Sequence, residues 1–146
     1  MPELPSRVLS FAVEGVLQPR PLSAPGRALC WAPALREVLL AAPDVQLLCH
    51  APRLAAQAQE NLGQLFGQRL LGWLPSQGQP YEMVQTWVTQ HAPAAKLLML
   101  DSDRRAYPRE AEWDLLICEP HLGVSDPDIL GAIEAWLLWS GWSPPA

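Results

Sequence analysis

The amino-acid sequence predicts a three-layer α/β/α domain, in which a parallel sheet of about five strands lies between helices on both faces. Short apolar runs alternate along the chain with longer segments whose apolar residues recur at helical spacing. This alternation is typical of βαβ units, which place their strands parallel in one sheet. A domain usually has about 100 to 200 residues, so residues 1–146 are expected to form a single domain.

The first predicted strand is the apolar run of residues 8–13, which ends at the Glu-Gly pair of residues 14–15. Residues 18–29 contain three prolines and one glycine and are expected to form a loop. Pro33 then suits the first position of a helix, because the N–H that proline lacks is not needed there. This helix is expected to stop at Pro43.

Two further pairs of strand and helix are predicted in the middle of the chain. Residues 45–49 (VQLLC) form a short apolar run, and apolar positions at helical spacing follow between residues 54 and 66. A weaker run, residues 69–74, precedes the turn-forming sequence SQGQP of residues 76–80. Apolar residues within 83–88 then mark a third helix.

The last two predicted strands are residues 96–100 (KLLML) and 115–118. We expect residues 96–100 to lie beside residues 8–13 at the centre of the sheet. The sequence SDPD of residues 125–128 is a helix start, with a capping side chain, a proline and an acid near the positive end of the helix dipole. The buried stripe of this final helix is predicted to be Ile129, Ile133, Trp136 and Leu137.

Composition argues against several functional classes. Nucleic-acid binding depends on clustered cations, but the net charge is −5 and the sequence contains no run of Lys or Arg. No apolar stretch approaches the ~18 residues of a membrane span, and the start MPELPSR does not resemble a signal peptide. The three cysteines show no CxxC spacing, which favours a reducing cytoplasm. The sequence does not indicate an oligomeric state.

The carboxyl ends of the predicted strands are where a ligand is expected. In sheets of this type, ligands bind beyond the carboxyl ends of the strands. The segments to inspect are therefore residues 12–15, 50–53 and 101–105, which follow the first, second and fourth predicted strands.

Two segments resemble motifs of the haloacid dehalogenase-like hydrolases. Residues 8–17 (VLSFAVEGVL) are similar to the first motif of that superfamily, an apolar strand that runs into DxDGxL. Residues 99–103 (MLDSD) are similar to a later strand that ends in paired or near-paired aspartates. Residues 118–137 and the arginine-flanked loop after the second strand resemble the small, nearly capless members. The resemblance covers most of the chain and implies a Rossmann-like domain.

The resemblance also implies that catalytic groups are missing. Ala12 stands where the superfamily has its nucleophilic aspartate, and Glu14 where it has the aspartate acid/base. An alanine methyl can neither attack phosphorus nor ligate magnesium. The hydroxyl that the superfamily places after the second strand falls at His50 or Ala51. Its phosphate-binding cation falls within residues 79–82 (QPYE), where there is no Lys or Arg.

Two aspartates are the candidate metal ligands. Asp101 matches the metal-binding aspartate after the fourth strand, and Asp103 substitutes for the second acid because Ser102 stands in its usual place. Together with Glu14 these oxygens are of the kind that magnesium prefers. The alternative is that the acids simply begin a loop or cap a helix. No cofactor is required on this interpretation, and weak magnesium binding is the most that is expected.

The candidate ligand-binding residues are a histidine and three arginines. Arg53, Arg104 and Arg105 lie near the predicted cleft and would contact an anion, or else be solvated surface residues. His50 either contacts the ligand or is a hydrogen-bonded structural residue. Lys96 is expected at the opposite edge of the sheet, because it precedes the carboxyl end of its strand by about 13 Å at ~3.3 Å per residue.

The chain contains seven tryptophans, three of them spaced three apart near its end. We expect Trp136 in the core. Trp139 and Trp142 either cover the edge of the sheet, which we favour, or form an exposed patch for a protein partner.

Two functions are compatible with these observations. In the first, the protein is a haloacid dehalogenase-like binding or regulatory module that has lost phosphotransfer and takes a small anion or a protein partner. In the second, it is a magnesium-dependent phosphohydrolase in which Glu14 activates water directly and Asp101 holds the metal. Ala12 favours the first.

Overall fold

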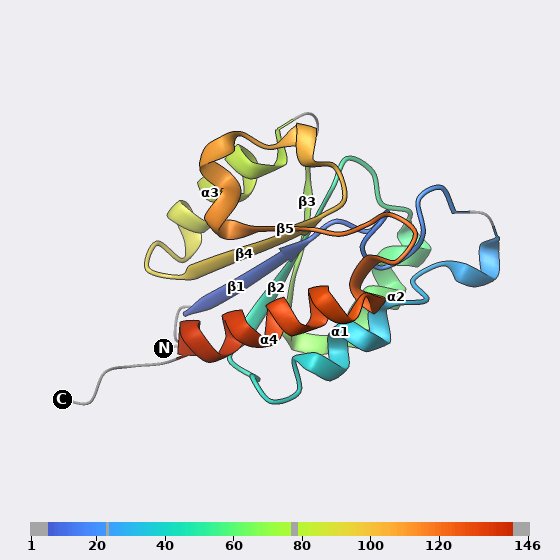
Figure 1. Ribbon diagram of the computed structural model, residues 1–146, viewed down its shortest axis with the longest axis horizontal. Helices are drawn as coiled ribbons and strands as arrows, with labels where there is room; N and C mark the ends of the chain where they lie inside the picture. The colour runs from blue at the N-terminus through green and yellow to red at the C-terminus, as the bar shows by residue number, and fades with distance from the viewer. Residues whose placement is uncertain (1–5, 23, 77–78, 142–146) are drawn as a thin grey trace.

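The computed structural model describes residues 6–22, 24–76 and 79–141, and these residues contain one parallel sheet (Figure 1). The sheet has five strands in the order β3-β2-β1-β4-β5, and every neighbouring pair is parallel. The predicted sheet is confirmed, with β1 at its centre and β4 beside it. The strands are β1 (Arg7–Phe11), β2 (Val45–Ala51), β3 (Leu70–Pro75), β4 (Lys96–Asp101) and β5 (Leu115–Ile117).

Helices cover both faces of the sheet (Figure 1). On one face lie α1 (Ala32–Val38), α2 (Ala56–Phe66) and α4 (Pro127–Gly141), and on the other lie α3 (Pro80–His91) and the 3-10 segment η4 (Arg109–Asp114). Successive side chains of a strand point to opposite faces, so each strand supplies both layers of the core. The remaining 3-10 segments are η1 (Pro25–Arg27), η2 (Gly67–Arg69), η3 (Arg104–Ala106) and η5 (Gly123–Ser125).

Strand β1 shows how this alternation places polar and apolar groups. Leu9 and Phe11 pack in the core under α1, α2 and α4, whereas Val8 packs in the core under α3. Ser10 follows the same alternation and therefore points to the α3 face. The same parity puts Leu48 of β2 and Met99 of β4 under α3.

Two elements are shorter than the sequence predicts. Strand β1 ends at Phe11, so Ala12 and Val13 belong to the turn that follows it. Helix α1 ends at Val38, and the Arg69 guanidinium binds carbonyl groups of the chain beyond it. It donates hydrogen bonds to the carbonyls of residues 39, 42 and 45, which hold the connection to β2 in a turn.

The amino ends of the strands lie at the edge of the sheet opposite the candidate residues. Lys96 begins β4 and its Nζ donates to the carbonyl of Ser140 at 2.9 Å, so it lies at the opposite edge, as predicted. Arg7 begins β1 and forms a hydrogen-bonded ion pair with Asp44, at 2.7 Å between Nη2 and Oδ1. Its Nη1 also donates to the carbonyl of Leu137, which ties the end of α4 to the sheet.

The tryptophans near the end of the chain are only partly buried. Trp136 was expected in the core; it packs against the core but is only half-buried. Trp139 exposes 73 % of its surface, so the favoured prediction that it covers the sheet edge is wrong. It follows Leu138, which is also exposed, at the turn of α4 that faces solvent. Trp142 lies outside the described residues.

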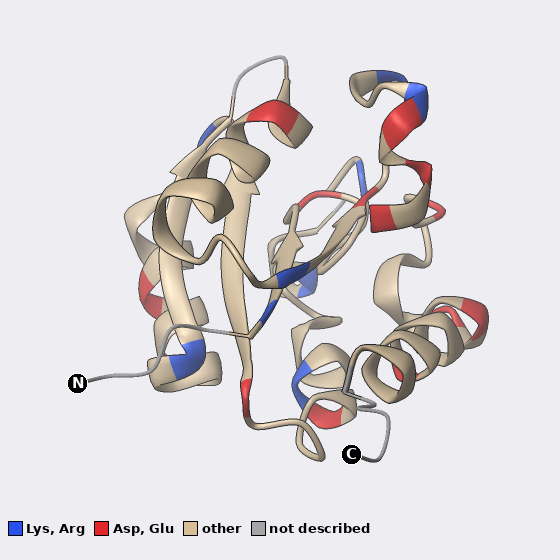
Figure 2. Cartoon of the chain, turned by 90° about the vertical axis from the view of Figure 1, so that its left-hand side faces the viewer, with Lys and Arg blue, Asp and Glu red and all other residues tan. Residues whose placement is uncertain are grey.

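Basic residues are spread over many elements, as the separate blue segments of Figure 2 show.

None of the helices in the part of the chain that the structure covers is long and apolar enough to cross a membrane.

Candidate functional site

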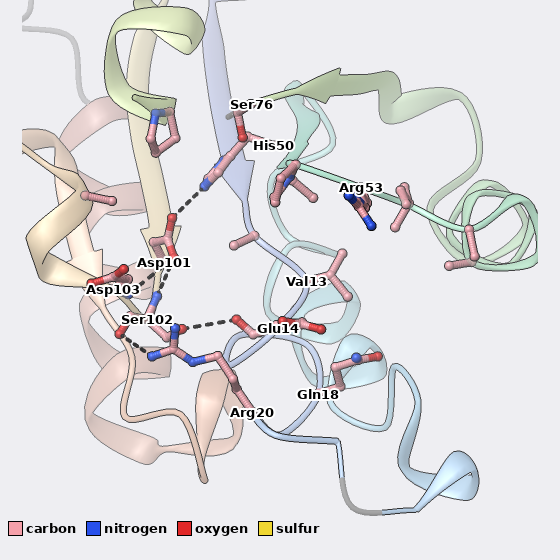
Figure 3. A pocket seen from close by; sticks show the side chains of 18 of the residues that line it. Val13, Glu14, Gln18, Arg20, His50, Arg53, Ser76, Asp101, Ser102 and Asp103 are labelled. Atoms are coloured by element: carbon pink, nitrogen blue, oxygen red, sulfur yellow. Dashed lines mark hydrogen bonds and ion pairs between the residues drawn. The ribbon is translucent and has the colours of Figure 1, made fainter. Parts of the chain in front are cut away.

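A pocket of about 960 Å³ opens at the carboxyl ends of the strands (Figure 3). All three segments that the sequence analysis selected, residues 12–15, 50–53 and 101–105, contribute side chains to its lining. Ser76, which follows β3, and Pro80, the first residue of α3, also line it. The pocket therefore lies where parallel sheets of this type bind ligands.

The turn after β1 presents a methyl group where the resemblance places a nucleophile. Ala12 lines the pocket, and its N–H donates to the carbonyl of Leu100 at 2.9 Å. Glu14 is exposed at the rim of the pocket. Its backbone carbonyl accepts a hydrogen bond from Ser102 Oγ at 3.1 Å, which joins this turn to the loop after β4.

The packing around Gly15 accounts for a glycine at this position. Its φ of +78° lies in the left-handed region, and a Cβ built on it would come within 2.2 Å of Ser102 Oγ. Only glycine fits this position without moving the loop after β4. The glycine of the motif is thus required by the packing of two loops, independently of any reaction.

Four buried side chains form a hydrogen-bonded network beneath the pocket. Ser10 Oγ lies 2.6 Å from His50 Nδ1, and His50 Nε2 lies 3.1 Å from Asp101 Oδ2. The hydroxyl of Tyr107 donates to the same carboxylate oxygen at 2.5 Å. Strands β1, β2 and β4 supply the first three groups, and the loop after η3 supplies the tyrosine. The network spans three adjacent strands on the face that α3 covers.

The series of Ser10, His50 and Asp101 contains the residue types of a hydrolytic triad. A nucleophilic serine must be accessible to its substrate, but Ser10 is 0 % exposed and lies within β1. The histidine is 1 % exposed. The network therefore links the strands. His50 makes the hydrogen bonds of a structural residue and also lines the pocket, so both of its predicted roles stay open.

The network keeps Asp101 ionised. Burial raises the pKa of this carboxyl group, but the hydrogen bond and charge of His50, followed by the hydroxyl of Tyr107 and the N–H of Ser102, lower it further than burial raises it. The net result is a pKa below the usual value. For Tyr107, burial and the nearby negative charge of Asp101 both raise the pKa of the phenol, so it stays a hydrogen-bond donor.

The donor set around Asp101 does not suit magnesium. Its Oδ2 accepts from His50 and Tyr107, and its Oδ1 accepts from the N–H groups of Ser102 and Asp103, at 2.7 and 3.4 Å. A carboxylate has about four lone-pair sites, and these four donors occupy them. Among the described residues, no group of three His, Cys, Asp or Glu side chains lies close enough to hold a metal ion.

The second predicted metal ligand is also engaged. Asp103 Oδ1 accepts from the N–H of Arg105 at 3.1 Å and lies 3.6 Å from Arg105 Nε. It caps η3, which is the alternative role that the sequence left open for acids after this strand. The arrangement argues against a magnesium site at Asp101 and Asp103.

The arginines near the pocket differ in how they are bonded. Arg105 lines the pocket and pairs with Asp103, while Arg20, which the sequence analysis did not select, donates to the carbonyl of Ser102 at 3.4 Å. Arg104 is not part of the lining and donates to the carbonyl of Tyr107 at 3.4 Å. Arg53 lines the pocket with no hydrogen bond or ion pair to any described residue.

Sequence reasoning missed four residues of the site: Ser10, Arg20, Ser76 and Tyr107. A single polar residue within an otherwise apolar strand was the available signal for Ser10. Tyr107 lies in a polar loop 57 residues from His50, and nothing in the local sequence indicates that the two meet. Ser76 was assigned only to a turn.

Comparisons with known proteins add no relative, since no family model, curated protein or solved structure matches the chain.

Proposed function

We propose that the chain is a haloacid dehalogenase-like protein that binds a small oxyanion in this pocket and does not transfer phosphoryl groups. The observation that carries the proposal is the bonding of Asp101, whose carboxylate is saturated by His50, Tyr107 and two backbone N–H groups. The resemblance assigns this aspartate to a metal, and phosphoryl transfer depends on such a cation for electrostatic stabilisation. In addition, Ala12 has no carboxylate that could act as the nucleophile.

An anion suits the pocket because its charges are unevenly satisfied. Asp101 and Asp103 already have donors within the chain, whereas the exposed guanidinium of Arg53, like the exposed carboxylate of Glu14 at the rim, has no partner among the described residues. An unpaired guanidinium that lines a pocket favours a carboxylate, phosphate or sulfate group. The expected ligand is therefore a small compound that carries such a group.

The experiment that tests the absence of phosphotransfer is a phosphatase assay with para-nitrophenyl phosphate and magnesium. We expect no turnover above that of buffer, and no beryllium fluoride adduct, because Ala12 cannot form an aspartyl-phosphate. The alternative phosphohydrolase would show robust turnover that Glu14→Gln abolishes. That result would refute the proposal, and Glu82→Gln, an exposed acid of α3, is the control for loss of charge.

A further inference from the structure

Helix α4 differs from the other three α-helices in the side chains that it exposes to solvent. The exposed positions of α1, α2 and α3 are mostly polar, as Arg36, Gln57 and Glu82 illustrate. In α4, Leu138 exposes 72 % of its surface and Trp139 73 %. A helix that is apolar on all sides is normally buried, and an exposed apolar surface often marks a contact with another molecule.

The exposed apolar residues lie along one side of α4. Gly131, Ala135, Leu138 and Trp139 follow one another at steps of four, three and one, and residues three or four apart share a helix face. The opposite side of the helix, which includes Ile133, packs in the core. A Cβ built on Gly131 would meet nothing within 4 Å, so the amino half of this outward face is open. Its two large side chains stand at the carboxyl half.

This distribution of sizes makes the face complementary to itself. When two copies of α4 pack antiparallel about a two-fold axis at Ala135, position 139 of each copy lies opposite position 131 of the other. Trp139 then packs over Gly131, where there is room for it. A parallel pair would instead set Trp139 against Trp139 and leave the small residues apart. A two-fold dimer uses the same patch on both copies, so a self-complementary face suits a second copy of the chain.

The charges around α4 also favour the antiparallel pair. Asp128 and Glu134 are exposed in its amino half. Its carboxyl end lies beside the amino ends of β1 and β4 (Figure 1), where the exposed Lys96 donates through Nζ to the carbonyl of Ser140 at 2.9 Å. Antiparallel packing brings Lys96 of each copy toward Asp128 of the other, whereas parallel packing brings like charges together. Charge complementarity therefore selects the same arrangement as side-chain size.

We infer that the outward face of α4, formed by Gly131, Ala135, Leu138 and Trp139, is a homodimer interface in which two copies of the helix pack antiparallel. None of these residues lines the pocket of Figure 3, so the inference is independent of the function proposed above. The 15 residues of α4 span about 22 Å. One helix face of this length is smaller than the ~800 Å² that each partner buries in a stable interface, so the expected dissociation constant is micromolar.

The test is sedimentation velocity of the full chain at increasing concentration. The mean mass is expected to rise from monomer toward dimer between about 1 and 200 μM. Leu138→Gln should weaken association by about tenfold or more, because each copy loses a buried leucine. Ala135→Arg should abolish it, because two cations would meet at the axis. The matched control is Leu40→Gln, a leucine with 66 % exposure on the side of α1 that faces α2, and it should associate as the parent chain does.

An exchange of charges tests the antiparallel arrangement itself. Lys96→Glu and Asp128→Lys are each expected to weaken association about two- to tenfold, because each replaces two attractive contacts by repulsive ones. The double variant should regain the parental dissociation constant. All the substituted side chains are exposed or small, and circular dichroism checks that each variant is folded.

Three results would overturn the inference. A parent chain that remains monomeric at about 200 μM would leave the face to a different protein. A dimer that Leu138→Gln and Ala135→Arg leave intact would have to form through another surface. If both single charge variants weaken association and the double variant does not regain it, the helices do not pack antiparallel.

Discussion

Replacement of His50 by alanine is expected to lower the free energy of unfolding by about 1 to 3 kcal/mol. The variant removes a hydrogen-bond partner of the buried, ionised carboxylate of Asp101 and the only described hydrogen-bond partner of the Ser10 hydroxyl. A buried polar group that loses its partner costs more than the net stability of the hydrogen bond itself. Urea unfolding followed by circular dichroism measures the change.

The matched control is His121→Ala, which removes an exposed histidine from a loop. Surface substitutions of this kind usually change stability by no more than about 0.5 kcal/mol. Ser10→Ala should fall between the two, because it leaves the pair of His50 and Asp101 in place. A loss below about 1 kcal/mol in His50→Ala would show that the network does not hold the strands together.

Ala12→Asp alone is expected to leave phosphatase activity at background. The substitution places a carboxylate where the resemblance expects one, but magnesium would still lack a second aspartate ligand, since Asp101 is saturated by protein donors. An additional negative charge next to Glu14 is also repelled unless a cation is bound. Loss of one donor to a transition state typically costs about 100- to 1,000-fold in rate, and here a cation and a hydroxyl are both missing.

The measurement is magnesium-dependent turnover of para-nitrophenyl phosphate by Ala12→Asp, with Ala12→Asn as the control of equal size. Folding of both variants is checked by thermal unfolding. Turnover by Ala12→Asp well above that of the parent protein would mean that the pocket already holds the donors needed for the reaction. Arg53 and Arg105, which line the pocket, would then be the first groups to replace.

The sheet could be predicted because strong local signals agree with the tertiary structure. Most of the apolar residues in the runs 8–13 and 96–100 are buried, and the strands that they form are parallel neighbours. Helix α1 was predicted to be too long, and the turn that follows it is bonded by Arg69, which is distant in sequence. Local propensity does not report a side chain that arrives from another element.

The site was located correctly at the strand ends, but its bonding was not foreseen. Asp101 was expected to face a metal, because a carboxylate after a strand gives no sign of which donors surround it. The phenol of Tyr107 reaches it from a loop that has no regular pattern. His50 was found as a candidate, yet its contact with Ser10 depends on the strand register. Such contacts exist only once the sheet has formed.

Titration of the protein with magnesium, followed by calorimetry in phosphate-free buffer, tests most directly whether protein donors have taken the place of a metal at Asp101. Saturation of the carboxylate by His50, Tyr107 and two N–H groups predicts no saturable heat at millimolar magnesium. A saturable heat that disappears in Asp101→Asn, but persists in the control Asp128→Asn on α4, would contradict the account and restore the magnesium-dependent phosphohydrolase as the better description.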